Sequence, residues 1–396
     1  MIADSIEVSK IGVEYIEIDT DDNEIAEAMQ QAFGTTDVRR LYPLIPARLT
    51  LELRGVSIAV ARALQRVMVD ELPGTRLEFS TGGYIMGRTT EPVMIEPFVA
   101  MRIQGIPLHP QIPQQIIQET RFSLYATNET TSTKDVYSGD LIQISGPSST
   151  PLFSPTFKIA FLDPGRTLTI ENIHITEGHG RQNASYNRSI LDGYKYLDLE
   201  EYPKELTHSL PSFLDREGDA SPQAPDMGTI SLAASSGYKA SSFKSNPRAH
   251  LMKFIIPQTP RDDDIVRSLA IDACVNIKDR LRYVQTILKA AVINETGPAY
   301  MRTQAQLVIT PSGEKDMKAV LTVRGETDTI GNLLRRTIYE MGPINYVGYK
   351  CTKHLGEMQL TVVHDLDEEG LKNRIIEAVS QAWEIFDRIQ QKVLTY

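Results

Sequence analysis

A strand–turn–helix unit that occurs twice constrains the fold of this chain more than any other feature of its sequence. In the second copy a strand runs to Arg324, Gly325 follows as a turn, and a helix from Asp328 ends at Gly342-Pro343. Arg54 and Arg324 lie 270 positions apart (324 − 54), and the same offset relates Gly55 to Gly325, Leu64 to Leu334, Arg66 to Arg336 and Pro73 to Pro343. This gapless repeat predicts two related modules, each presenting one helix, that face one another about a pseudo-twofold axis.

The helix of the second copy separates apolar from polar side chains. Asp328 is expected to cap it, because a carboxylate accepts hydrogen bonds from the free N–H groups of the first turn. Its apolar face comprises Ile330, Leu333, Leu334 and Ile338, and the residues that project elsewhere are Asn332, Arg335 and Arg336. The two arginines are either an ordinary solvated surface or an interface that offers fixed guanidinium forks. The equivalent Arg66 in the first copy favours an interface.

The rest of the chain predicts an α+β protein with a β-rich insert in its first half. A strand at 12–18 is expected to be followed by an acidic turn, Asp19 to Asp22, which caps a helix through Phe33. Residues 94–108 favour a short helix or turn, residues 110–200 have mostly strand periodicity, and residues 207–248 form a Ser-, Pro- and Gly-rich loop. Further strands are expected at 48–53, 75–80, 251–256, 304–310, 318–323, 345–350 and 357–363.

Two long helices close the two halves of the chain, each with a single apolar stripe. The first begins at Asp262-Asp263-Asp264 and is expected to end before Thr296-Gly297-Pro298, and the second is the last element of the chain. Spacings of three and four residues predict that the stripes pack against one another. The residues expected in this seam are Leu269, Ile277, Leu281, Ile375, Val379, Phe386 and Ile389.

Composition excludes several classes of function. The 41 basic and 51 acidic residues give a net charge of −10, so no global basic field attracts nucleic acid, and direct sequence-specific contact is not expected. Two cysteines cannot form a disulfide framework or a four-cysteine metal site, and they suit a reducing compartment. The N-terminus does not have the pattern of a secretory signal, and no apolar run approaches the ~18 residues of a membrane span.

Catalytic and metal-binding patterns are weak throughout. The Asp262-Asp263-Asp264 run is better explained as helix capping than as a metal site, since consecutive side chains diverge. The loop that starts at Asp365 resembles a calcium loop, but Ile376 occupies its twelfth position, where Glu is needed. His174 and His179 have no further ligands at metal spacing, and Gly178-His179-Gly180-Arg181 taken alone is an ordinary turn. We therefore expect no catalytic residue, cofactor or metal in this chain.

Two groups of motifs resemble the α-like subunits of multisubunit DNA-directed RNA polymerases. Asp328 to Arg336, with Tyr346-Val347-Gly348-Tyr349 after it, is similar to the archaeal L-type subunit, whose pattern runs D-x-T-x-G-N-x-L-R and then continues with a G-Y strand. Glu96 to Leu108, Asp163-Pro164-Gly165 and Glu177 to Ala184 are similar to the D-type subunit. A fusion of D-type and L-type parts on one chain resembles the arrangement in nucleocytoplasmic large DNA viruses.

The resemblance implies the α-like dimerisation fold present twice, as an intramolecular pseudo-dimer with an inserted β-rich domain. The implied divisions are an extension at 1–46, a D-like module at 47–109 and 250–295, an insert at 110–249, and an L-like module at 296–396. The four-cysteine metal loop of some relatives is missing, so no zinc or cluster is implied.

The function that the resemblance implies is a non-catalytic platform on which the two largest polymerase subunits and a small subunit assemble, inside infected cells and in the virion. The expected partner-contact residues are Arg62, Arg66, Arg102, Gly178, Gly180, Arg181, Asn332, Arg335 and Arg336. The alternatives are a free-standing two-domain enzyme or binding protein, for which no convergent polar cluster is found, and a transcription regulator, which the charge disfavours.

Overall fold

The computed structural model describes residues 6–17, 30–31, 33–34, 37, 41–79, 84–87, 96–147, 151–196, 249–290, 305–312, 315–352 and 356–396. Within them the chain mixes helices with antiparallel sheets, which confirms the α+β prediction. Most of the helix predicted after Asp19, the loop predicted at 207–248 and the break predicted at Thr296 lie outside the described residues. None of the described helices is long and apolar enough to cross a membrane.

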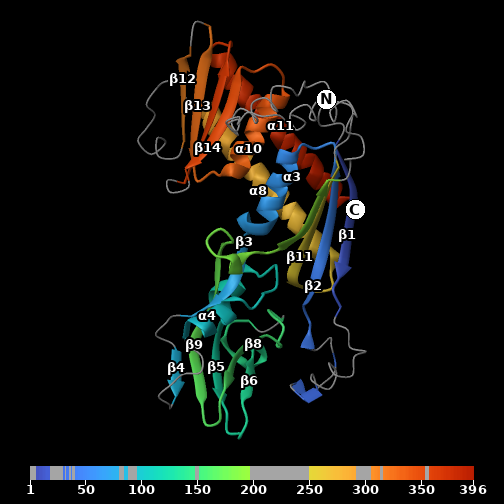
Figure 1. The fold of residues 1–396 in the computed structure, drawn as a ribbon, viewed down its shortest axis with the longest axis vertical. Coiled ribbons are helices and arrows are strands. Elements are labelled where there is room, and N and C mark those ends of the chain that lie inside the picture. The colour runs from blue at the N-terminus through green and yellow to red at the C-terminus, as the bar shows by residue number, and fades with distance from the viewer. Residues whose placement is uncertain are drawn as a thin grey trace, which may run out of the picture.

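The structure contains two large four-stranded antiparallel sheets, of which the second lies at one end of the molecule and the first runs along its side from the middle (Figure 1). The first has the order β1-β2-β11-β10, with strands Glu7–Tyr15, Ile45–Arg54, Ala249–Thr259 and Ile190–Tyr196. The second has the order β12-β13-β15-β14, with strands Ala305–Pro311, Met317–Arg324, Glu357–His364 and Tyr346–Thr352. In β2, Leu49, Leu51 and Leu53 are fully buried while their neighbours are not, which is the period of a half-buried strand.

A smaller β-rich unit lies at the opposite end (Figure 1). Its five-stranded sheet has the path β3-β9-β5-β7, with strands Pro73–Glu78, Thr167–His179, Arg121–Thr127 and Leu141–Ser145, and β4 (Tyr84–Gly87) also pairs with β9. A two-stranded sheet and two short helices complete it: β6 (Lys134–Tyr137), β8 (Lys158–Leu162), α4 (Glu96–Gln104) and α5 (Gln114–Glu119). This unit has a hydrophobic core of its own, separate from the core that the two larger sheets share.

The structure draws the boundaries of the β-rich unit differently from the sequence prediction. β3, β4 and α4 were expected in the first module but belong to this unit. β3 pairs with β9 directly after the helix stop at Pro73-Gly74, β4 also pairs with β9, and α4 contributes to the core of the unit. β10 was expected in the insert but pairs with β11 in the first sheet. The predicted N-terminal extension supplies β1, the edge strand beside β2. Alternation identifies a strand, but it does not identify the neighbour with which that strand pairs.

The two copies of the repeated unit have matching geometry and touch one another. The helices α3 (Ile58–Arg66) and α10 (Asp328–Glu340) begin 270 positions apart (328 − 58) and are in contact (Figure 1). The glycines before them, Gly55 and Gly325, have φ values of 70° and 78°, a region that side chains rarely adopt. The first helix continues as a π-helical turn, Val67–Glu71.

The predicted N-cap of α10 is wrong by one residue. Thr327, not Asp328, has the extended backbone of a cap, and its hydroxyl accepts a hydrogen bond from the N–H of Thr329. Asp328 occupies the first helical position, where its charge still favours the positive end of the helix dipole. Either residue type can cap, so the sequence did not distinguish them.

Substitution of Gly325 with alanine is expected to lower the free energy of unfolding by about 1 kcal/mol, because its positive φ penalises any Cβ. The Cβ itself would meet nothing within 4 Å, so the loss would report backbone strain alone. Chemical denaturation of the purified chain measures it. Gly12→Ala is the control, since this strand residue has no positive φ and its Cβ would make only ordinary contacts. Equal losses in both variants would contradict the prediction.

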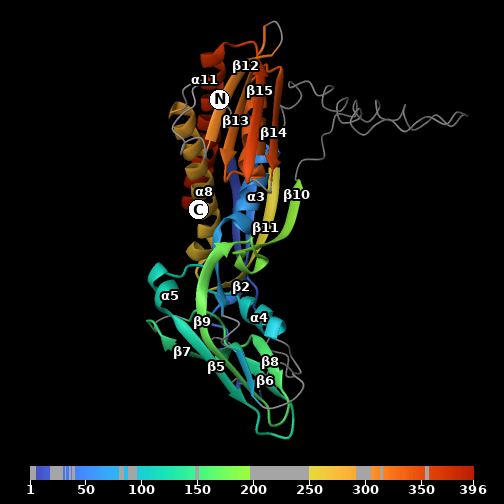
Figure 2. The same ribbon diagram turned by 90° about the vertical axis from the view of Figure 1, so that its left-hand side faces the viewer.

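The long helices α8 (Asp263–Ala290) and α11 (Glu368–Leu394) lie side by side over the two large sheets (Figure 2). The seven residues predicted for the seam are all buried in the shared core. Asp262 caps α8, because its carboxylate accepts from the N–H of Asp264 at 3.0 Å, and Asp367 of the calcium-like loop caps α11 in the same way. Asp262 therefore has the capping role that was preferred to a metal site for its run of aspartates.

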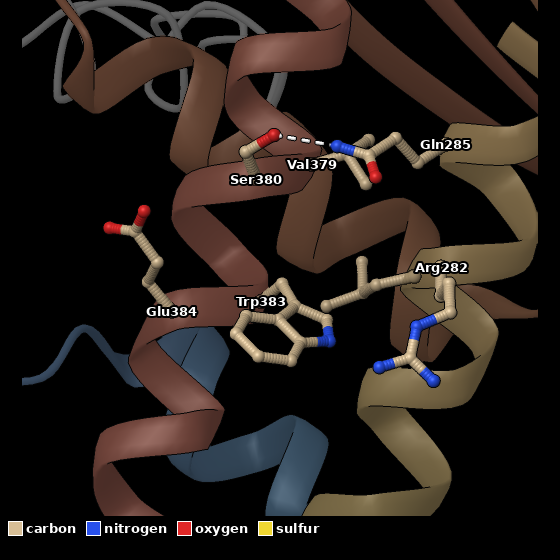
Figure 3. Close-up of a pocket in the computed structure, with 7 residues that line it drawn as sticks. Arg282, Gln285, Val379, Ser380, Trp383 and Glu384 are labelled. Carbon is tan, nitrogen blue, oxygen red and sulfur yellow. Dashed lines mark hydrogen bonds between the residues drawn. The ribbon is translucent and has the colours of Figure 1, made fainter. Parts of the chain in front are cut away.

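Polar contacts join α8 to α11 at the rim of the seam. A shallow groove between them is lined by Leu281, Arg282, Gln285, Val379, Ser380, Trp383 and Glu384 (Figure 3). The amide of Gln285 donates to the Ser380 hydroxyl across it at 2.7 Å (Figure 3). Lys278 pairs with Asp387 at 2.6 Å and lies 4.9 Å from the Trp383 ring. Such directional contacts fix the register of two helices whose apolar stripes alone would allow sliding.

Candidate docking interface

The two repeat helices, which contact one another, carry five of the predicted contact residues on their polar sides. We call Arg62, Arg66, Asn332, Arg335 and Arg336 the docking face. Arg62, Arg66 and Arg335 are exposed, whereas Asn332 and Arg336 are half-buried. The apolar residues of α10 face inward, as the helical period predicts.

Local contacts hold three of these arginines in place. Arg62 lies over the ring of Tyr194 at 4.3 Å and donates to Gln65 at 2.7 Å. Arg335 donates to the side-chain oxygen of Asn332 at 3.1 Å. Arg336 pairs with Glu340 one turn on at 2.7 Å. Side chains that are ordered before binding lose less conformational entropy when a partner arrives.

Tyr349 of β14 packs against α10, the second repeat helix. Its ring packs so closely on α10 that a Cβ at Gly331 would lie 2.6 Å from it. Burial raises the pKa of the Tyr349 phenol, as does the charge of Asp328, while Arg66 and Arg335 act to lower it. Arg66 from the first copy and Arg335 from the second therefore act on one phenol. Tyr349 was not among the predicted contact residues, although it ends the G-Y strand pattern.

The turn at Gly178, Gly180 and Arg181 packs against neighbouring parts of the chain. A Cβ at Gly178 would lie 2.7 Å from the Tyr186 ring, and one at Gly180 would lie 1.7 Å from the side-chain oxygen of Asn187. The nearby His179 ring contacts the backbone oxygen of Glu71 at 3.1 Å. Internal packing thus explains why both positions are occupied by glycine. Their contact with a partner stays a prediction.

Arg181 leads into a network of ion pairs that the sequence did not reveal. One of its guanidinium nitrogens donates to Glu71 and, at 3.0 Å, to the Thr327 hydroxyl. The Glu71 carboxylate also accepts from Arg280 and from the hydroxyl of Thr329. We call Glu71, Arg181, Arg280 and Glu326, with Thr327 and Thr329, the ion network. The side chain of Arg181 is 38% exposed, so the network reaches the surface at this residue.

Arg280 of α8 is the centre of the ion network. Its Nη1 donates to Glu71, while its Nε and Nη2 donate to Glu326 at 3.1 and 2.6 Å. The side chains of Glu71 and Glu326 are only 4% and 6% exposed. Burial acts to lower the pKa of Arg280, but its hydrogen bonds and charge interactions with the two glutamates outweigh burial and raise it. The guanidinium therefore stays charged.

Arg102 lies apart from the docking face. It is exposed on α4 of the β-rich unit, beside the exposed side chains of Phe98 and Met101. The structure thus places five predicted contact residues on the contacting helices α3 and α10, three in the turn at the end of β9, and Arg102 on another element.

The described residues give no sign of a metal centre or an activated nucleophile. No group of three or more His, Cys, Asp or Glu side chains among them is placed to hold a metal ion. Burial raises the pKa of the Cys274 thiol to about 12, and burial with the charge of Asp328 raises that of Cys351 to about 11. Both thiols are protonated near neutral pH, so neither is a reactive thiolate.

Comparison with known proteins places this architecture in a family. No protein-family model matches the chain. It is 33% identical over 355 residues to the DNA-directed RNA polymerase RPB3-11 homolog of African swine fever virus isolate Pig/Kenya, covering 89% of each chain. The chain belongs to this family. The homologs of the Tick/Malawi isolate and of the Badajoz strain are 32% and 33% identical over the same coverage. The predicted resemblance to a fused α-like polymerase subunit is thereby confirmed.

Proposed function

We propose that the chain is the non-catalytic platform subunit of a DNA-directed RNA polymerase, on which the two largest subunits dock. The observation that carries this proposal is the contact between α3 and α10, two repeated helices whose exposed side chains differ. Related surfaces with unlike side chains can orient two unlike partners. The RPB3-11 homologs of African swine fever virus are named as RNA polymerase proteins, which supports the assignment.

The proposed organisation is an intramolecular pseudo-dimer. Its first module comprises the sheet of β1, β2, β11 and β10 with α3 and α8, and its second comprises the sheet of β12 to β15 with α10 and α11. The β-rich unit is proposed as the insert, which offers Arg102 and the turn at Gly178 to further contacts, including a small subunit. We place the chain inside infected cells and in the virion.

A protein partner suits the docking face better than nucleic acid does. Its arginines are few, Arg336 is already paired with Glu340, and the chain carries a net charge of −10. Tight binding to a nucleic-acid backbone commonly involves about 6–10 phosphate contacts. A free-standing regulator that reads DNA is therefore disfavoured, and catalysis is proposed to lie in the partner subunits.

The double substitution Arg335→Ala with Arg336→Ala is expected to leave the chain folded and to weaken assembly. An interfacial arginine paired with a buried carboxylate contributes on the order of 2–5 kcal/mol, whereas a solvated arginine contributes almost nothing. The measurement is recovery of the two largest subunits with the tagged chain from its native source. Arg282→Ala with Lys392→Ala removes the same charge from exposed positions on the long helices and is the matched control. Equal recovery with both double variants would place Arg335 and Arg336 in solvent.

A further inference from the structure

The ion network lies where the ends of the two repeat helices meet. Glu71 ends the helical turn that continues α3, while Glu326 and Thr327 directly precede α10. Arg280 reaches both from the middle of α8. We propose that Glu71, Arg280 and Glu326 are positioning residues that set the orientation of α3 relative to α10 and hence the geometry of the docking face. Only the consequence for assembly depends on the proposed function.

The geometry of Arg280 suits this role because its guanidinium is a rigid planar fork. One edge, Nε with Nη2, holds Glu326 through two hydrogen bonds, and Nη1 holds Glu71. Rotation of either helix would break at least one of these bonds, since the guanidinium cannot follow both carboxylates at once. The Thr327 hydroxyl accepts from the same Nη2 at 3.0 Å, which connects the cap of α10 to the fork.

Apolar packing at the helix crossing is less specific than the ion network. The buried residues of α3 are mostly small: Ala59, Val60, Ala61, Ala63 and Leu64. Alanine side chains form a smooth surface, and hydrophobic contact is non-directional. Packing through this face of α3 therefore sets the distance between α3 and α10 better than the angle between them. A buried ion network, by contrast, contributes little net stability, because the desolvation of its charges offsets their attraction. Its hydrogen bonds nevertheless favour one arrangement of the helices over others.

The ion network also connects the docking face to the β-rich unit. Arg181 donates to both Glu71 and Thr327, and it comes from the turn that follows β9. Four separate segments therefore meet at two carboxylates. A displacement of any one of them would disturb the hydrogen bonds of the others, as in other fully connected polar networks.

The test measures the orientation directly in the full-length chain. Spin labels at Arg62→Cys and Asn332→Cys, equivalent positions on α3 and α10, report the distance between the helices by pulsed electron resonance. The background is Cys351→Ser, and Cys274 is fully buried and protonated. The ion network is replaced by Glu71→Met, Arg280→Met and Glu326→Met together, which leaves no buried charge unpaired among the three. Labels at Arg282→Cys and Glu384→Cys, across α8 and α11, are the control pair.

We expect the 62–332 distance distribution to broaden roughly twofold in the triple variant, as the helices sample more than one packing, with the 282–384 distribution unchanged. Unchanged width at 62–332 in a folded variant would overturn the proposal. Broadening of both pairs, or loss of the folded state, would also overturn it, because the network would then support the fold as a whole.

A measurement of assembly distinguishes a failure of this inference from a failure of the proposed function. The triple variant without labels is expected to recover fewer of the two largest polymerase subunits than the wild-type chain does, in proportion to the broadening. If the wild-type chain itself recovers neither, the platform function fails, while the distance measurement still decides whether the ion network orients the helices.

Discussion

Replacing Arg280 with alanine is expected to destabilise the folded chain by about 3–5 kcal/mol, since the change leaves the buried Glu326 carboxylate without its cation and removes one of the two cations of Glu71. Glu71 and Glu326 are almost completely buried, and Arg280 supplies the hydrogen bonds that hold Glu326. Arg181 still contacts Glu71 in the variant. The expected loss of stability is therefore smaller than it would be if both carboxylates lost every cation. Denaturant unfolding followed by circular dichroism measures the change.

Arg282 provides the control on the same helix. Its side chain is 65% exposed and its ion pair with Asp279 is long, at 3.5 Å. An exposed pair of this kind contributes about 0.2–1 kcal/mol at most, so Arg282→Ala is expected to change stability little. If the two alanine variants lost the same stability, the ion network would not be the buried structure described above.

The repeated unit could be predicted from the sequence because its signals are local. Glycines at the same offset, a strand before each and a stop after each lie within about 25 residues, and Gly55 and Gly325 do adopt positive φ. Burial of the seam residues also follows from helical period alone, since every third or fourth position meets the same neighbour.

The ion network could not be predicted, because its members are far apart in sequence and ordinary in composition. Glu71 and Arg280 are separated by 209 positions, and Arg280 and Glu326 by 46. A charged residue beside an apolar stripe normally indicates a solvated flank, and nothing local distinguishes Arg280 from Arg282. Only the tertiary arrangement, which brings the end of one repeat helix to the start of the other, buries them together.

The turn at Gly178 shows a different limit of sequence reasoning. A G-x-G pattern indicates close approach of the backbone to something, but not to what. The structure shows that Tyr186 and Asn187 are the close neighbours, only a few residues further along the chain. A partner can still contact the exposed part of Arg181, so the prediction for that residue concerns a side chain that also has an internal role.

Truncation of Phe386 to alanine is expected to cost about 3–5 kcal/mol, the usual range for a large aromatic side chain removed from a core. Phe386 is fully buried on α11, in the core that combines both large sheets and all four of their helices. Leu394 near the end of the same helix is 61% exposed, so Leu394→Ala is the matched control and is expected to have a small effect.

The shared core also predicts how the Phe386→Ala variant unfolds. Trp383, the only tryptophan, lies at the seam between α8 and α11, so its fluorescence reports that seam, while the helical circular dichroism signal comes mainly from α3, α8, α10 and α11, which share one core. Because one core spans both sheets, the seam and the sheets are expected to lose structure together, and both signals should shift to lower denaturant by the same amount. A fluorescence transition that moves alone would show that the seam unfolds independently, and that the two halves do not share the core as one cooperative unit.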